Sequence, residues 1–133
     1  MKNKYKISKS NLDRMIIEAV MAAKKNGLEI CGLLIFNGYF IELVKVRNKI
    51  KRGGGFEFYV NDIRFLQKAT KKIDHEIIGT FHSHPEYIAK PSESDIYNAL
   101  DDSFMLIIDT VDQEVNLWHI KNLKKKRIQF ELI

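Results

Sequence analysis

Residues 76–95, EIIGTFHSHPEYIAKPSESD, form the stretch from which the fold is most readily inferred. The segment opens with apolar residues that predict a buried strand over 76–84, and this strand ends in two histidines. A short loop with two prolines follows. Ser92 is then placed to cap a helix predicted over 92–102. The stretch therefore predicts a strand, a loop and a helix in immediate succession.

The rest of the chain mixes helices and strands. Apolar residues at helical spacing predict helices over 10–26 and 61–74. Apolar runs and apolar–polar alternation predict strands over 4–7, 29–36, 39–47, 56–60, 104–109, 115–120 and the end of the chain, after a charge run. The strand over 4–7 and the last strand are expected at edges of the sheet. Because the two kinds of element do not alternate strictly, we expect an α+β fold, an α/β/α sandwich-like arrangement around a mixed sheet.

Local signals mark the ends of several elements. Ser8 and Ser10 are candidate N-caps for the first helix, and Asn61 can cap the second. Asn37-Gly38 predicts a two-residue hairpin turn. The glycines at 53–55 predict a plain loop, because they lack the GxGxxG spacing and the Lys-Ser/Thr pair of phosphate-binding loops.

Composition limits the class of protein. The chain has 133 residues, of which 45% are hydrophobic and 29% charged, and this is the balance of a globular protein. The length suits one compact domain, so we treat 1–133 as a single domain. No apolar run is long enough to span a membrane, and the N-terminal residues do not resemble a secretory signal. A single cysteine cannot form an internal disulfide, so we expect a reducing, cytoplasmic location.

His82 and His84 lie two residues apart at the end of a predicted strand. Alternate strand residues point to the same face, so both imidazoles can face one point. Pro85 keeps His84 in an extended conformation, which restrains that side chain further. Because neutral imidazole is a good zinc ligand, the pair predicts two ligands of a metal site.

Two carboxylates can complete such a site. Asp95 lies about one turn into the predicted helix and can act as a third ligand. Three protein ligands, with a fourth position left for water, are typical of catalytic rather than structural zinc. Glu29 begins an otherwise apolar strand, and a general base beside a zinc-bound water is one reason for an acid there.

Each of these residues also has an ordinary structural explanation. Ser92 and Asp95 have the spacing of a helix capping box, and a histidine at a strand end is usually a surface residue. Glu29 can be solvated ahead of its strand. The combination favours a metal-binding or catalytic site over these structural explanations. His-x-His followed after seven residues by Ser-x-x-Asp arises by chance in roughly one chain in several thousand.

Glu29, the run His82-Ser83-His84-Pro85, Ser92 and Asp95 together resemble the signature of the JAMM (MPN+/JAB) zinc metalloprotease family. Residues 29–34, EICGLL, are similar to the first strand of that family. The order of the predicted helices and strands also matches, so the resemblance covers most of the chain. It implies a compact prokaryotic-type member with the JAB/MPN fold, in which helices flank a mixed, curved sheet.

The resemblance implies a role for each motif residue. His82, His84 and Asp95 would bind one Zn2+ per chain, with water as the fourth ligand. Glu29 would act as general base and then as general acid. Ser92 would help to stabilise the oxyanion of the tetrahedral intermediate. The chain would then be a deubiquitinase-like isopeptidase or endopeptidase, which hydrolyses the bond after the C-terminal tail of a ubiquitin-like protein.

The compact length bears on the expected substrate. The chain lacks the long insertions with which eukaryotic members grip ubiquitin chains, so it resembles stand-alone bacterial or archaeal members. Those members process ubiquitin-like or sulfur-carrier proteins, sometimes beside activating and conjugating enzymes. We expect Tyr87 and Ile88, in the loop at 85–91, to contact such a tail, and we expect no membrane partner.

Other functions stay open as alternatives. The same fold can serve as a non-catalytic scaffold, or as a phage-type peptidase of the same family. The run Lys124–Arg127 can bind nucleic-acid phosphates, but a solvated run ahead of an edge strand explains it more simply. Cys31 lies on the same predicted strand face as Glu29, but it has no histidine left to activate it and is expected to be a small buried residue.

Overall fold

A computed structural model describes residues 5–133 except Gly53 and Tyr87. Its strands are β1 (Tyr5–Ile7), β2 (Cys31–Phe36), β3 (Ile41–Val46), β4 (Glu76–His84), β5 (Ser103–Asp109), β6 (Val115–Lys121), β7 (Lys124–Ile128) and β8 (Phe130–Leu132). Its helices are α1 (Lys9–Asn26), α2 (Val60–Lys72) and α3 (Glu93–Asn98). No helix within these residues is long and apolar enough to cross a bilayer.

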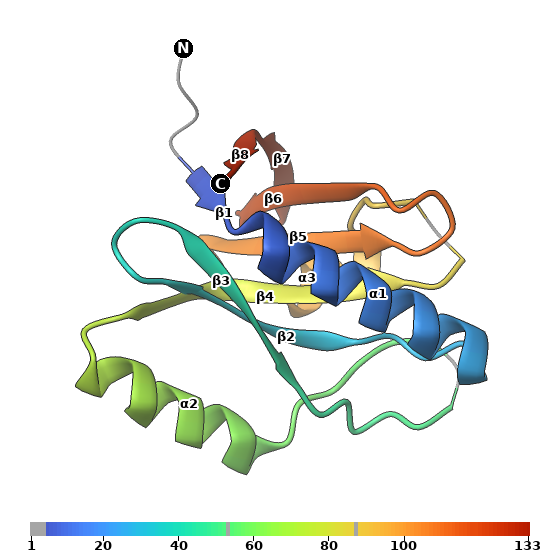
Figure 1. The fold of residues 1–133 in the computed structure, drawn as a ribbon, viewed down its shortest axis with the longest axis horizontal. Helices are drawn as coiled ribbons and strands as arrows, with labels where there is room; N and C mark the ends of the chain where they lie inside the picture. Colours follow the sequence, from blue (N-terminus) through green and yellow to red (C-terminus); the bar gives the residue numbers. More distant parts are fainter. Residues whose placement is uncertain (1–4, 53, 87) are drawn as a thin grey trace.

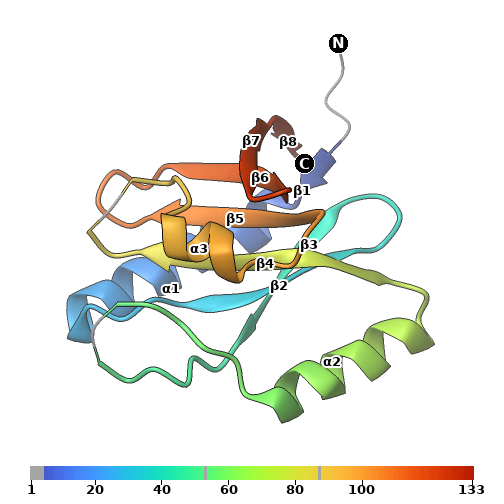
Figure 2. The same cartoon turned by 180° about the vertical axis from the view of Figure 1, so that it is seen from behind.

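The strands form one mixed sheet in the order β7-β6-β5-β4-β2-β3-β1-β8. The pairs β4–β5, β1–β3 and β1–β8 are parallel, and the others are antiparallel. Helix α1 crosses one face of the sheet (Figure 1), and α3 lies on the opposite face (Figure 2). This arrangement confirms the predicted α+β class with a mixed sheet between helices.

The core lies on both faces of the central strands. Side chains alternate along β5, so Leu106 and Ile108 join the cluster under α1, whereas Met105 and Ile107 join the cluster under α3. All four side chains are buried. The central strands therefore read as continuous apolar runs rather than as alternating ones.

The sheet is strongly curved. Only Gln129 separates β7 from β8, yet β7 pairs with β6 and β8 pairs with β1, at the two ends of the strand order. Figure 1 shows both strands near β1 and β6. The last residues of the chain therefore connect the two ends of the sheet, and β1 lies inside the strand order instead of at the predicted edge.

The first helix follows its local signals closely. Ser8 is the N-cap and accepts a hydrogen bond from the backbone N–H of Asn11 at 3.4 Å. Gly27 ends the helix with φ 63°, in the left-handed region that favours glycine. Leu12, Met15 and Ala19 form its buried face. The prediction over 10–26 is confirmed to within one residue.

Several local predictions are wrong. Residues 56–59 are irregular rather than a strand, because Phe56 packs on the ring of His82 instead of joining a ladder. Helix α2 begins at Val60 with Tyr59 as N-cap, which leaves Asn61 inside the helix and not at the cap. Helix α3 ends at Asn98 rather than at 102.

The β2–β3 hairpin also differs in its turn. The backbone N–H of Asn37 donates to the carbonyl of Phe40, so the tip consists of Gly38 and Tyr39 rather than Asn37-Gly38. The Asn37 side-chain oxygen accepts from the N–H groups of Tyr39 and Phe40, at 2.9 and 3.0 Å. Asparagine thus stabilises the turn from its entry position.

Gly79 permits the close pairing of β4 and β5, so we expect Gly79→Ala to destabilise the protein strongly. A Cβ at this position would lie 1.9 Å from the carbonyl oxygen of Phe104, which is rigid backbone. We expect the free energy of unfolding in urea to fall by about 3 kcal/mol or more. Gly54→Ala is the matched control, because its nearest contact would be an ordinary 3.7 Å. Equal stability of the two variants would contradict the close approach.

Candidate metal centre

His82 and His84 end strand β4 with their rings on the same side, as the two-residue spacing predicts. The rings are almost completely buried, at 0% and 5% exposure. Their Nε2 atoms are 3.0 Å apart. Burying two imidazoles costs free energy unless their ring nitrogens meet hydrogen-bond partners or a metal ion. The groups around the two rings therefore determine whether this site can bind a metal.

Asp95 provides a third group at the same point. Its Oδ2 atom lies 3.1 Å from Nε2 of His82 and 3.2 Å from Nε2 of His84. Four-coordinate zinc with bonds of about 2.0–2.1 Å would separate its ligand atoms by roughly 3.3 Å. Two imidazole nitrogens and one carboxylate oxygen at this spacing fit a divalent cation such as zinc.

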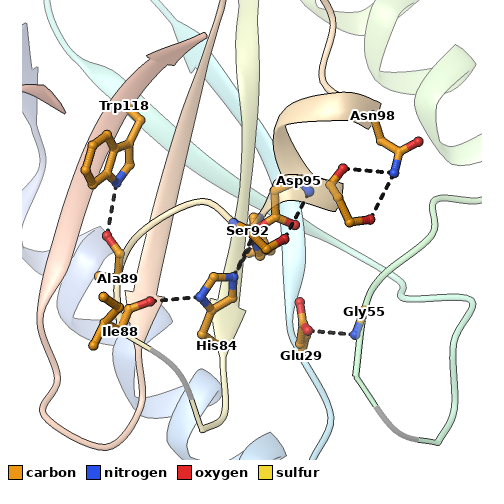
Figure 3. A network of polar contacts seen from close by, with 11 residues as sticks. Glu29, Gly55, His84, Ile88, Ala89, Ser92, Asp95, Asn98 and Trp118 are labelled. Atoms are coloured by element: carbon orange, nitrogen blue, oxygen red, sulfur yellow. Dashed lines mark hydrogen bonds and ion pairs between the residues drawn. The ribbon is translucent and has the colours of Figure 1, made fainter. Parts of the chain in front are cut away.

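The capping box and the ligand cluster use the same residues at once. The backbone N–H of Ser92 donates to Oδ2 of Asp95 at 2.9 Å, and the backbone N–H of Asp95 donates to Oγ of Ser92 at 3.0 Å. Helix α3 therefore begins where its cap requires, and the cap also directs the carboxylate toward the histidines (Figure 3). Ser92 and Asp95 therefore form the helix cap and belong to the candidate metal site at the same time.

The charge balance of the cluster favours an ionised carboxylate. Burial alone would raise the pKa of the Asp95 carboxyl, but its hydrogen bonds with His82 and His84 outweigh burial and hold that pKa well below its ordinary range. Burial alone would lower the pKa of His84, but contacts with Asp95 and with the carbonyl of Ile88 raise it on balance. The cluster thus already has the negative charge that a cation requires.

A backbone carbonyl orients His84. Its Nδ1 atom lies 2.9 Å from the carbonyl oxygen of Ile88 (Figure 3). A carbonyl can only accept, so Nδ1 carries the hydrogen and donates it. In the neutral ring Nε2 then presents its lone pair toward His82 and Asp95, as a metal ligand must.

His82 is held by packing instead. Its ring stacks on Phe56, with centroids 4.7 Å apart and an interplanar angle of 29°. Its Nδ1 atom is buried and has no hydrogen-bond partner among the residues that the structure describes. Phe56 therefore covers one ligand of the cluster, a role that its predicted strand assignment did not suggest.

Glu29 lies beside the cluster, two residues before β2 begins, and not at the first position of the strand as predicted. It is 8% exposed, and its Oε2 atom accepts from the backbone N–H of Gly55 at 2.6 Å (Figure 3). Its negative charge contributes to the raised pKa of His84. The glycine loop, predicted to be plain, thus holds a buried acid next to the histidines.

Two residues that the sequence reasoning missed fix Glu29 in place. Ser83, between the two histidines, accepts from the N–H of Ile30 through Oγ at 2.9 Å, and its own N–H donates to the carbonyl of Ile30 at 3.1 Å. Asn48 donates to the carbonyls of Glu29 and Gly55 at 2.9 and 3.2 Å. Neither residue shows its role in the sequence, although Ser83 lies inside the His-x-His motif.

A cleft leads to the cluster. It has a volume of about 1380 Å³ and extends between α2 and α3 along β4, with Asp95 among its lining residues. Ile88, predicted to contact substrate, is 62% exposed. Tyr87, predicted with it, lies outside the described residues. Cleft and cluster together give a site in which a long ligand can lie beside a metal ion.

Comparison with known proteins identifies the family. Residues 11–121 match the family of prokaryotic homologs of the JAB domain. The chain belongs to this family. The match covers most of the sequence and includes every residue of the cluster, so the resemblance inferred from the motif is confirmed for this JAMM/MPN-type domain.

Solved structures share the fold of this JAB-type domain. A solution structure of a protein from Desulfitobacterium hafniense has 25% identity and a TM-score of 0.80, over 97% of this chain and 92% of that chain. A JAB1/MPN domain protein from Archaeoglobus fulgidus has 19% identity and a TM-score of 0.62, over 96% and 98%. A structure described as a metalloprotease-like zinc site in the proteasome and signalosome has 19% identity and a TM-score of 0.51, over 97% of each chain. No curated protein matches the sequence.

Metal binding is directly testable. We expect the purified protein to bind close to one divalent cation per chain, measured by elemental analysis after dialysis. His84→Ala or Asp95→Ala should lose the ion, because two ligands are too few to hold it. His119→Ala is the matched control, since it removes a His–Asp contact away from the cluster, His119 to Asp102 at 2.7 Å. Loss of metal in the control alone would place the site elsewhere.

The thiol of Cys31 is expected to be unreactive in the folded protein. It is fully buried, and burial together with the nearby charge of Glu29 raises the pKa of its thiol to about 12. In the folded protein we expect no reaction with Ellman's reagent at pH 8, and one thiol per chain after unfolding in guanidinium. Rapid labelling of the native protein would instead indicate an accessible nucleophile.

Proposed function

We propose that the chain is a zinc-dependent metallopeptidase that hydrolyses the bond after the C-terminal tail of a ubiquitin-like or sulfur-carrier protein. The observation that carries this proposal is the convergence of His82, His84 and Asp95 on one point, with the buried carboxylate of Glu29 beside them. Membership of the JAB family supports the same chemistry. A bound zinc ion supplies Lewis acidity, which lowers the pKa of water and polarises the scissile carbonyl.

Glu29 moves the proton in this proposal. Its carboxylate takes a proton from the attacking water and delivers it to the leaving amine, so the peptide bond breaks and one water molecule is consumed. The hydrogen bond from the N–H of Gly55 leaves Glu29 fixed in orientation, with an acceptor oxygen close to the ligand cluster. A base held in this way needs little reorganisation before reaction.

Ser92 supplies a hydrogen-bond donor. Its Oγ accepts from the N–H of Asp95, so the hydroxyl hydrogen is available to donate. We assign this hydrogen to the oxyanion of the tetrahedral intermediate, because preorganised donors at that atom stabilise the transition state. The same hydroxyl keeps the helix cap intact, so its position is set before substrate binds.

The cleft supports a tail-like substrate. An extended chain can lie between α2 and α3 along β4 and reach Asp95. Ile88, in the loop after β4, is exposed and is assigned to the same substrate. The described chain offers no long insertion to grip a folded polyubiquitin, so recognition falls on the tail itself. Activating and conjugating enzymes of the same modification pathway are the expected partners, and the cytoplasm is the expected location.

Glu29→Gln separates catalysis from metal binding. We expect the variant to keep about one zinc per chain, because Glu29 is not a ligand, and to lose about 10²–10⁴-fold in kcat/KM, because the amide cannot accept the proton. The assay is cleavage of a reporter fused to the C-terminus of a ubiquitin-like or sulfur-carrier protein. Glu114→Gln, which changes an exposed acid outside the cleft lining, is the control and should cleave like wild type.

The same assay tests the alternatives. Full activity of Glu29→Gln would eliminate the assigned proton transfer. One zinc per chain without cleavage of any tail substrate would favour a non-catalytic scaffold. Cleavage only of cell-wall or unrelated peptides would favour a phage-type peptidase. A separate binding assay tests the nucleic-acid alternative. Salt-dependent binding that is lost on neutralising Lys124–Arg127, the exposed residues of strand β7, would favour a nucleic-acid-binding module.

A further inference from the structure

Strand β6 is connected to the ligand cluster by a chain of hydrogen bonds that the proposed mechanism does not use. Trp118 donates through Nε1 to the carbonyl of Ala89 at 3.0 Å (Figure 3), and Asn116 donates through Nδ2 to the same oxygen at 3.1 Å. Trp118 and Asn116 lie two residues apart on β6 and so share one face of the sheet. Both bonds therefore fix a single peptide group in the loop after β4.

That peptide group passes the constraint on to His84. The carbonyl of Ala89 and the N–H of Lys90 belong to one planar peptide unit. This N–H donates to the carbonyl of Ile88 at 2.8 Å, and the same carbonyl accepts from Nδ1 of His84 at 2.9 Å. Trp118 and Asn116 thus orient the planar peptide group between Ala89 and Lys90. The N–H of that group holds the carbonyl of Ile88, which in turn sets the tautomer of His84.

In the described part of the chain, the carbonyl of Ile88 meets the N–H of Lys90 and Nδ1 of His84. Ile88 is 62% exposed, so its side chain adds little packing to hold this carbonyl. Ala89, in contrast, is 1% exposed and packs against Met105, Ile107 and Ile120. The anchored residue of the loop is therefore the one whose carbonyl the two β6 side chains hold.

We infer that Trp118 and Asn116 are positioning residues for His84, which keep its Nδ1–H donated to Ile88 and its Nε2 lone pair directed at the metal. This inference rests on the proposed metal site and goes beyond it, since neither residue touches metal or substrate. Outer hydrogen-bond partners of ligating histidines commonly contribute about 10–100-fold to metal affinity. We expect a contribution at the lower end of that range, because Asn116 remains when the tryptophan donor is removed.

The test replaces one N–H group. Trp118 is the only tryptophan, so growth of a tryptophan auxotroph on an analogue changes this position alone. The ring of 3-benzothienylalanine has sulfur in place of the indole N–H, whereas 5-fluorotryptophan keeps the N–H and is the matched control. Zinc affinity is measured by competition with a chromophoric chelator, and the stability of the metal-free proteins by urea unfolding.

We expect the benzothienyl protein to bind zinc about 10-fold more weakly than the fluorotryptophan protein, which should match wild type. In the zinc-loaded protein with ¹⁵N-labelled histidine, the Nδ1 proton of His84 should also exchange faster with water. Asn116→Leu should weaken zinc binding in the same direction. His119→Gln, on the adjacent position of β6 and facing Asp102, should leave zinc affinity unchanged.

The outcomes separate the two proposals. Equal zinc affinity of the benzothienyl, fluorotryptophan and wild-type proteins would overturn the positioning role and leave the metal site intact. Wild type that binds no zinc, and is indistinguishable from His84→Ala, would overturn the metal site and the positioning role together. A merely structural role of the indole would lower the urea stability of the metal-free benzothienyl protein without slowing or speeding exchange of the His84 proton.

Discussion

The burial of two imidazoles at the end of β4 is the constraint on which the site depends. At 0% and 5% exposure, His82 and His84 have lost the water that would satisfy their ring nitrogens. The carbonyl of Ile88 takes one nitrogen, and the carboxylate of Asp95 meets the two that face each other. Three neighbouring elements meet this requirement. Helix α3 supplies the carboxylate, the loop after β4 supplies the carbonyl, and Phe56 stacks on the ring of His82. A cation at the centre would satisfy both Nε2 atoms, and Nδ1 of His82 stays without a hydrogen-bond partner among the described residues.

The sequence predicts the elements that rest on side-chain pattern. Strand β4 begins and ends at the predicted residues, because its apolar run and its two histidines are both visible in the sequence. The family and the grouping of His82, His84 and Asp95 follow from the same pattern. The β2–β3 turn differs through local hydrogen bonds of Asn37, whereas the segment at 56–59 differs because a tertiary contact decides its backbone. Phe56 and Phe58 recur at alternate positions as in a strand, but Phe56 packs on His82 and joins no ladder.

The contacts of the site that the sequence does not reveal are mainly hydrogen bonds of main-chain groups. The N–H of Gly55 holds Glu29, and the carbonyl of Ile88 orients His84, yet a backbone group has no residue type by which to recognise it. The side chains that hold the neighbouring backbone, Ser83 at Ile30, Asn48 at Glu29 and Trp118 at Ala89, are ordinary residue types. Each acts across a long separation in sequence, so only the fold shows which backbone group it meets.

Helix α3 shows how closely the site and the fold are coupled. Six residues are too few for a helix to be stable in isolation, and none of its residues is buried. Its cap, Ser92 with Asp95, satisfies its first N–H groups, and the same carboxylate links it to the end of β4. A cation held by Asp95 and the two histidines would tie α3 to the sheet by stronger bonds than packing offers. Since α3 also forms one wall of the cleft, metal binding would fix the shape of the surface on which the proposed substrate tail would lie.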